Sequence, residues 1–185
     1  MSISPDAHRG RRACTSRSSS SRTRSRKRAR SALQPDVTAI TSALRSAGLT
    51  SVEVEQTSLG VIVRAQNAEL LQLLSALRDS SSEFTFMVDL FGVDTGELVE
   101  ITYHLRSLSR DEDVYVRTSV EYDDGFPSVW EIYPAALMPE REVAEMFGLK
   151  LSGHPNPKRL LTTDGLEPML LKRVEIRSAE EVRSR

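Results

Sequence analysis

Hydrophobic and polar residues follow one another along the chain in patterns that predict two blocks of secondary structure. The first block opens with apolar residues spaced as on one face of a helix: Val37, Ile40, Leu44 and Ala47. Pro35 and Asp36 are typical of a helix start, and Gly48 is typical of a helix end. Residues 51–64 predict a β-hairpin, and residues 67–78 predict an amphipathic helix. The apolar residues of that helix are Leu70, Leu71, Leu74 and Leu77.

The second block predicts three strands followed by helices. Four apolar residues occupy every second position in the first strand: Phe84, Phe86, Val88 and Leu90. Residues 98–108 and 114–120 predict the other two strands. The pattern turns helical at Ser128, but Pro134 and Pro139 limit its continuity, so we expect two short helices over 128–137 and 139–147.

This order of elements predicts an α+β fold. We expect a two-layer sandwich in which helices cover one face of a mixed or antiparallel sheet. The proline-containing residues 150–185 predict an extended, irregular C-terminal arm. The expected organisation is therefore a tail over 1–33, a domain over 34–149 and an arm over 150–185.

Charge divides the chain at the same place as the hydrophobic pattern. The formal net charge of the 185 residues is −1, but residues 1–33 carry ten Arg or Lys and a single acid, Asp6. The remainder of the chain has a formal charge of −10. The single cysteine, Cys14, excludes a disulfide framework or an all-cysteine metal site within the chain.

The basic tail is rich in Arg and Ser and has no apolar periodicity, so we expect it to be disordered. It could bind nucleic acid, act as an organellar transit peptide or bind anionic lipid. It contains no aromatic residue that could stack on bases and no apolar segment typical of a secretion signal. We therefore favour a dispensable extension, or a start codon assigned too far upstream.

Candidate catalytic residues do not form a recognisable constellation in the sequence. Nucleotide-binding glycine motifs and a nucleophile elbow are absent. His8, His104 and His154 lack the spacing of metal ligands, so we do not expect a metal site. The carboxylates of Glu140, Glu142 and Glu145 could serve acid–base chemistry, but such residues are common on solvated helices. Arg141 and Glu145 have the i,i+4 spacing of a weak helical ion pair.

The segment EREVAEMFGLKLSGHPNPKRLL, residues 140–161, is more specific than any of these features. It resembles the signature of the 30 kDa subunit of respiratory complex I. The matching positions are Glu140, Arg141, Glu142, Glu145, Met146, Phe147, His154, Lys158, Leu160 and Leu161. Similarity in order and spacing extends upstream through 88–94, 99–108 and 127–142. It covers about 34–175, but residues 167–173 depart from the family's usual continuation.

This resemblance implies a non-catalytic subunit in the peripheral arm of a proton-translocating NADH:quinone oxidoreductase. Its expected partners are the quinone-site large subunit and other peripheral-arm subunits. FMN, iron–sulfur clusters and quinone would be bound by those partners, with no cofactor in this chain. The expected location is the cytoplasmic face of a bacterial inner membrane, or the mitochondrial matrix if the tail is a presequence. The alternatives are the equivalent subunit of a membrane-bound hydrogenase and a nucleic-acid-binding protein.

The signature residues also suggest structural roles. Gly148 would permit a left-handed helix end, and Gly153, His154 and Pro155 would fix an extended exit. Arg141 could form a fork with a carboxylate, and we expect Lys158 and Arg159 to meet an acidic patch. Two alternatives stay open for Glu140, Arg141, Glu142 and His154: they bind a neighbouring subunit, or they brace the helix internally.

Overall fold

The computed structural model describes residues 35–57, 60–122 and 124–166. The description below concerns the unit that spans residues 32–185. The predictions for the tail and for residues 167–185 lie outside the described residues.

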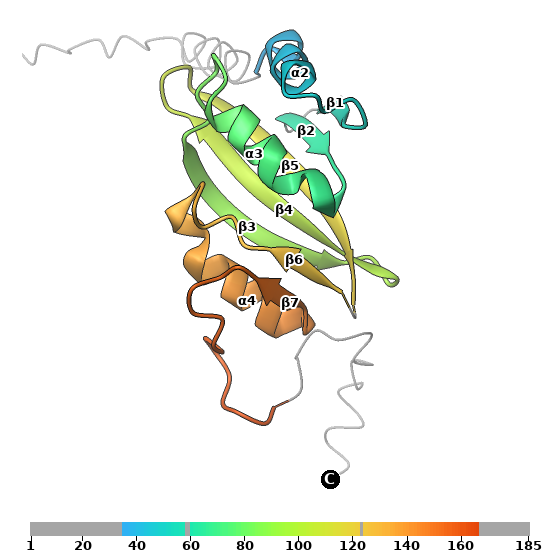
Figure 1. Cartoon of the computed structure of the whole chain (residues 1–185), viewed down its shortest axis with the longest axis vertical. Coiled ribbons are helices and arrows are strands. Elements are labelled where there is room, and N and C mark those ends of the chain that lie inside the picture. The colour runs from blue at the N-terminus through green and yellow to red at the C-terminus, as the bar shows by residue number, and fades with distance from the viewer. Residues whose placement is uncertain (1–34, 58–59, 123, 167–185) are drawn as a thin grey trace, which may run out of the picture. The chain divides into compact units, whose positions relative to one another are not determined.

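The main sheet has five strands in the order β1-β2-β5-β4-β3 (Figure 1). The strands are β1 Glu53–Thr57, β2 Gly60–Arg64, β3 Phe86–Asp94, β4 Leu98–Ser107 and β5 Glu112–Glu121. Strands β2 and β5 pair in parallel, whereas the other neighbours are antiparallel. The sheet is therefore mixed, and β1 and β3 form its two edges.

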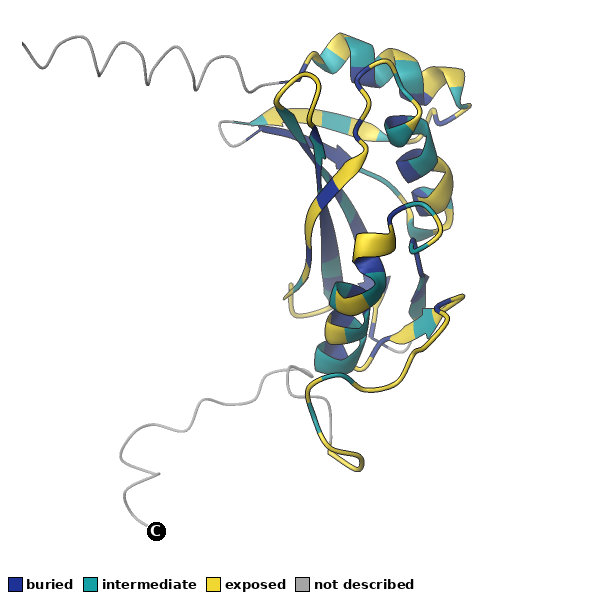
Figure 2. Cartoon of the chain, turned by 90° about the vertical axis from the view of Figure 1, so that its left-hand side faces the viewer, coloured by how far each residue is buried: buried dark blue, intermediate teal, exposed yellow. Residues whose placement is uncertain are grey.

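Helices cover one face of this sheet, as Figure 2 shows from the side. They are α2 Val37–Ser46, α3 Leu70–Arg78 and α4 Leu137–Phe147, and two 3-10 turns, η1 Asn67–Glu69 and η2 Pro134–Ala136, precede α3 and α4. A small parallel sheet joins β6 Gly125–Pro127 to β7 Lys150–Ser152. The predicted two-layer α+β sandwich is confirmed, and the first three residues of the predicted arm form β7.

The core lies between the sheet and its helices. The buried side of β4 carries Val99, Ile101, Tyr103 and Leu105, all fully buried, as the alternation requires. The predicted helix over 67–78 is confirmed, but its buried face differs. Leu73 is buried and Leu71 is exposed. Leu70, Leu73, Leu74 and Leu77 follow the spacing of one helical stripe, and Leu71 falls outside it.

The alternation predicted around β3 is wrong in two places. Phe84 and Leu90 are buried as expected, but Phe86 and Val88 are exposed and Met87 is buried instead. The pairing of β3 with β4 shifts register between Met87 and Asp89. An extra residue in one strand reverses the faces on either side of it, so a uniform period of two fails here.

The helical prediction near residue 128 also needs correction. Residues 128–133 form a turn, and η2 runs directly into α4, so the two expected helices are one short turn and one helix. Pro139 does not divide them, because it occupies the first turn of α4, where a backbone N–H has no helical partner.

Candidate functional site

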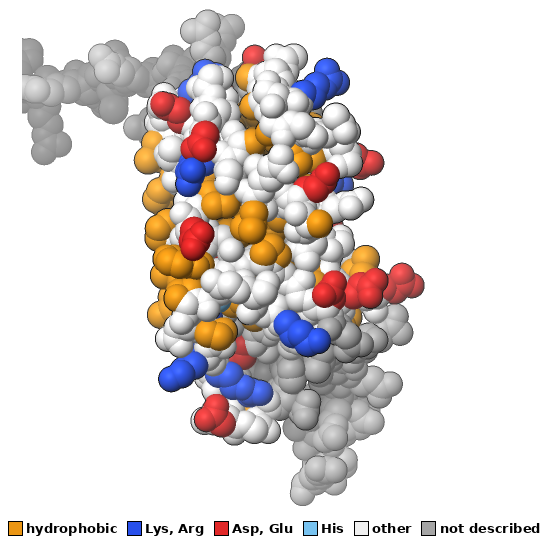
Figure 3. All heavy atoms as spheres, in the orientation of Figure 1, with side chains coloured by type: hydrophobic (Ala, Val, Ile, Leu, Met, Phe, Trp, Pro, Cys, Tyr) orange, Lys and Arg blue, Asp and Glu red, His pale blue; other side chains and the backbone are white. Residues whose placement is uncertain are grey.

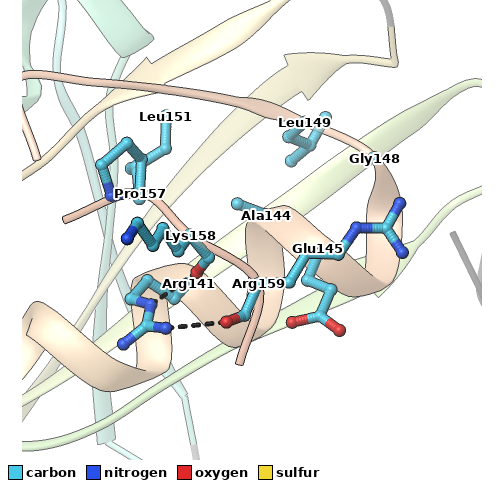
Figure 4. A pocket seen from close by; sticks show the side chains of 9 residues that line it. All are labelled: Arg141, Ala144, Glu145, Gly148, Leu149, Leu151, Pro157, Lys158 and Arg159. Carbon is cyan, nitrogen blue, oxygen red and sulfur yellow. Dashed lines mark hydrogen bonds between the residues drawn. The ribbon is translucent and has the colours of Figure 1, made fainter. Parts of the chain in front are cut away.

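The signature residues Arg141 and Glu145 lie one helical turn apart on α4 and bind the chain that follows β7. The Arg141 Nε donates to the Lys158 carbonyl at 2.7 Å. Its Nη2 donates to the Arg159 carbonyl at 2.8 Å (Figure 4). The planar guanidinium therefore binds two successive carbonyl oxygens with one fork. We refer to residues 153–166 as the clamped arm.

Glu145 binds the next three residues of the clamped arm. Its carboxylate accepts the backbone N–H groups of Leu160, Leu161 at 3.0 Å and Thr162 at 2.6 Å. It also accepts the Thr162 hydroxyl. The Thr162 hydroxyl and the Leu160 N–H lower the pKa of Glu145 to about 2, because each donor favours the charged carboxylate.

These contacts replace two interactions that the sequence suggested. The ion pairs of the described residues do not include one between Arg141 and Glu145, because both side chains bind the arm's backbone. Arg141 was also expected to bind a carboxylate with both arms of its guanidinium, but it binds two carbonyl oxygens instead. Arg141 supplies donors and Glu145 supplies acceptors, so together they satisfy both kinds of backbone group on the arm.

A cavity of about 230 Å³ lies between α4 and the clamped arm (Figure 4). The side chains of Arg141, Glu145, Lys158 and Arg159 give it a charged wall. We expected Arg159 to contact an acidic patch, and its hydrogen bonds show otherwise. Its guanidinium donates within the arm, to the Thr162 hydroxyl and the Thr163 carbonyl at 3.1 Å and to the Leu166 carbonyl at 2.6 Å.

His154 connects the clamped arm to the start of α4. Its Nε2 lies 2.9 Å from the Leu137 carbonyl, and its Nδ1 accepts the Asn156 N–H at 3.0 Å. A carbonyl can only accept and a backbone amide can only donate, so these partners select a neutral ring protonated at Nε2. The Gly153 carbonyl accepts the Trp130 indole N–H at 3.1 Å. The arm's exit from β7 is therefore fixed from two sides.

Glu140, near the start of α4, is fully buried. Its carboxylate accepts the Ser128 hydroxyl and the Val129 N–H, the latter at 2.6 Å. Burial raises the pKa of Glu140, and the hydrogen bonds from Ser128 and Val129 oppose that rise. Glu140 thus holds the turn before η2 against the helix.

The other signature residues differ in what surrounds them. Gly148 has φ 71° and ends α4 in the left-handed conformation, as expected. Phe147 is buried, Met146 and Leu160 are partly buried, and Glu142, Pro155 and Leu161 are exposed. All the hydrogen bonds described above for the signature lie within the chain. A contact of Glu140, Arg141, Glu142 and His154 with a neighbouring subunit stays a prediction.

Sequence reasoning missed the partners of the signature rather than the signature itself. Ser128, Trp130 and Thr162 supply side-chain donors, and the remaining partners are backbone groups. Backbone carbonyls and amides are the same at every position, so no pattern marks which ones are bound. Ser128 could have been found, because a hydroxyl just before a helical pattern is a common capping residue.

The described ranges show neither a cluster of metal ligands nor a helix suited to a bilayer. Within 35–57, 60–122 and 124–166, no three His, Cys, Asp or Glu side chains gather as metal ligands would. Over the same ranges, every helix is too short or too polar to cross a membrane.

The fold and the site define a two-layer α+β domain in which side chains of α4 bind the backbone of the segment that follows β7. The chain belongs to the family described as respiratory-chain NADH dehydrogenase, 30 Kd subunit, whose model matches residues 63–179. The match spans β2 through the clamped arm.

Individual relatives agree with this assignment. The chain is 37% identical over 134 residues to the C subunit of the NADH-quinone oxidoreductase of Rhodobacter capsulatus, covering 70% of this chain and 66% of that protein. For the corresponding protein of Ruegeria pomeroyi the identity is 34% over 110 residues, covering 57% and 55%. For that of Caulobacter vibrioides it is 31% over 150 residues, with 75% of each covered. The chain thus spans less than two-thirds of the length of the first two relatives.

A solved structure has the same fold. It is a chain of the membrane-bound sulfane sulfur reductase, an archaeal respiratory membrane complex, with a TM-score of 0.58 and 22% identity. The similarity covers 68% of this chain and 75% of that one. At this identity the comparison supports the architecture and nothing finer.

Proposed function

We propose that this chain is a non-catalytic, peripheral subunit of a proton-translocating NADH:quinone oxidoreductase, and that it docks against the quinone-site large subunit. The observation that carries the proposal is the family match, which includes both α4 and the clamped arm. In this proposal the clamped arm is the docking element. Leu161 and Leu166 on it are 59% and 51% exposed, as apolar residues that meet a partner would be.

The contacts of the signature support a structural role rather than a catalytic one. Arg141, Glu145 and His154 each bind backbone groups of the arm or of α4. Such bonds fix the course of an extended segment and lower the entropy it would lose on binding a partner. FMN, iron–sulfur clusters and quinone would be bound by partner subunits, and membrane association would come through the complex.

The direct test is affinity purification of the tagged chain from native membranes, followed by mass spectrometry. Recovery of the quinone-site large subunit together with flavin and iron–sulfur subunits is the expected result. A nickel-binding large subunit would instead assign the chain to a membrane-bound hydrogenase. Recovery of nucleic acid or of no partner would contradict both assignments.

Substitutions test whether the clamped arm, rather than another part of the surface, is the docking element. We expect Arg141→Ala and His154→Ala to lower co-purification of the large subunit, because each releases the arm from α4. Arg45→Ala is the matched control, since Arg45 is exposed on α2, outside the signature, and forms none of the arm contacts described. Undiminished co-purification with both Arg141→Ala and His154→Ala would rule out the clamped arm as the docking element.

A further inference from the structure

Strand β3 is a long edge of the main sheet. It spans nine residues, Phe86–Asp94, and β4 is its one neighbour in the sheet order. Within the described part of the chain, no backbone hydrogen bond links β3 to any segment other than β4. Helix α4 covers one face of β3, as the approach of Phe147 to Gly92 shows. The opposite face and the outer edge stay uncovered by helices.

Four large apolar side chains of β3 are exposed. Their exposed fractions are 48% for Phe86, 44% for Val88, 40% for Phe91 and 47% for Val93. Phe86, Phe91 and Val93 pair with Arg106, Thr102 and Glu100 on the sheet face away from the helices. Orange side chains gather along the left margin of Figure 3, the side on which β3 runs in Figure 1. We call these four residues the β3 row.

An edge of this kind is unusual without a partner. Proteins protect long edges with proline, with lysine or by making the strand short, because unpaired N–H and C=O groups recruit other strands. Strand β3 contains no Pro, Lys or Arg. Its one bulge, near Val88, interrupts the pairing locally and leaves Leu90 to Asp94 in regular register with β4. The long regular part of the edge therefore remains able to accept a strand.

The charge around this edge indicates the chemistry of the partner. Residues 79–98 hold five acids, Asp79, Glu83, Asp89, Asp94 and Glu97, and no Lys or Arg. Asp79 is already paired with Arg78, and Asp89 and Asp94 belong to β3 itself. Asp89 is exposed, and its carboxylate accepts the Leu90 N–H at 2.8 Å. Arg106, which lies opposite Phe86, already contacts Asp111 and Asp113. The edge thus combines an apolar row with an acidic border.

Two occupants from the same protein fit this surface poorly. A second copy would place the acids of its own β3, Asp89 and Asp94, along the same edge, and like charges across paired strands are destabilising. The chain's own basic tail has complementary charge, but residues 9–30 contain no Val, Ile, Leu or aromatic residue to cover the β3 row. The remaining class of occupant is another protein.

We propose that β3 accepts an added β-strand from a neighbouring subunit of the parent complex, in which apolar residues alternate and Lys or Arg flank them. The main-chain bonds of such a strand would extend the sheet, and its apolar side chains would cover the β3 row. Its basic residues would meet the exposed carboxylate of Asp89. This inference rests on the proposed function, because it requires a parent complex.

Photo-crosslinking in the assembled complex tests it. A photoreactive phenylalanine analogue replaces Val93 or Phe91 in the tagged chain, and crosslinked peptides are identified after purification from native membranes. The expected product joins β3 to an extended segment of another subunit that contains alternating apolar residues and Lys or Arg. Leu71 on α3, which is 41% exposed, is the matched control position and should give none of this product.

Other products would overturn the inference. Crosslinks to residues 1–33 would assign the edge to the tail, and crosslinks to a second copy would assign it to self-association. A yield at Val93 and Phe91 no higher than at Leu71 would leave the edge without a partner strand. If the chain co-purifies with the complex in any of these cases, the inference fails while the proposed function holds. If the chain fails to co-purify with a complex, both fail.

Substitution gives an independent measurement. Val93→Lys places a charge in the β3 row and should lower retention of the chain in the complex roughly tenfold. Leu71→Lys introduces the same charge at similar exposure and should leave retention unchanged. Equal unfolding temperatures of the two variants would show that the difference comes from binding. Equal retention of the two would contradict the inference.

Discussion

At the scale of single residues, helix α4 places two glutamates in opposite environments. Glu140 is buried against Ser128 and Val129, and burial raises its pKa. Glu145 accepts several donors from the clamped arm at the protein surface, and they lower its pKa to about 2. Side chains of the same type, five positions apart, therefore respond to pH in opposite directions.

Glu145 makes attachment of the arm dependent on pH. The pKa of its carboxyl falls from 4.5 to about 2 on folding, so its stabilising contribution is complete above 4.5. That contribution is lost as pH falls from 4.5 toward 2. We expect hydrogen exchange at the Leu160–Thr162 amides to accelerate over this range. Glu145→Gln should accelerate it already at pH 7, whereas Glu142→Gln should not. Exchange that stays slow in Glu145→Gln would contradict the clamp.

Substitutions of Glu140 test whether its hydrogen bonds to Ser128 and Val129 stabilise the fold. Glu140→Ala leaves the buried Val129 N–H without an acceptor and should lower the free energy of unfolding by about 1–3 kcal/mol. Glu140→Gln keeps an acceptor oxygen and should cost less. Because the folded pKa of Glu140 is raised, ionisation above pH 4.5 disfavours the folded state. The free energy of unfolding of Glu140→Gln should therefore fall less between low and high pH than that of the unsubstituted chain. Urea unfolding at pH 5 and pH 8 measures both effects. Equal losses in the free energy of unfolding for Glu140→Ala and Glu140→Gln would contradict a stabilising role of the hydrogen bonds to Glu140.

At the scale of elements, the position of α4 depends on a glycine in β3. A Cβ at Gly92 would lie 2.6 Å from Phe147 Cε2 and 3.3 Å from Val143 Cγ1. The first distance is shorter than real Cβ contacts, so with a larger residue at position 92 the Phe147 ring or the helix must shift. The helix that carries the signature is therefore held against the sheet at the one residue of β3 without a side chain.

Gly92→Ala should destabilise the domain by about 1–3 kcal/mol through overpacking. Thermal or urea unfolding of the purified chain measures the change. Phe147→Leu removes the ring that the new methyl group meets. Gly92→Ala should therefore destabilise the Phe147→Leu variant less than it destabilises the unsubstituted chain. Additive effects of the two substitutions would show that they do not interact across this contact.

Elements with a regular period could be predicted from the sequence, and irregular ones could not. The buried face of β4 and the helix at 37–46 follow their patterns directly. The bulge near Val88 has no local marker, because whether one residue is extra depends on the partner strand. At the site, the residues of the signature could be identified, but their partners are largely backbone groups. Those groups are fixed by the path of the arm and not by residue type.

At the scale of the whole molecule, charge and structure divide the chain in the same way. The basic tail precedes residue 35, and the contacts that form the core, the clamp and the β3 edge lie in the acidic part. The described hydrogen bonds of the site are complete without residues 1–33. We therefore expect the tail to be dispensable for the geometry proposed to support docking.

A chain lacking residues 1–33 should co-purify with the same subunits as the full chain. Its unfolding temperature should also be unchanged, since the core lies in the retained part. Any salt-dependent nucleic-acid binding by the full chain should disappear with the deletion, because the clustered arginines are removed. Loss of complex subunits on deletion, with an unchanged unfolding temperature, would show that the tail contributes to assembly.

The parallel pairing of β2 with β5 constrains the order in which the chain folds during synthesis. The hairpin β1–β2 is made first, yet Val61 must wait for Val114 before it gains its neighbour in the sheet. Strands β3, β4 and β5 pair through short connections and can assemble as they leave the ribosome. We therefore expect the N-terminal hairpin to join the sheet of β3, β4 and β5 only after β5, its partner, has been made.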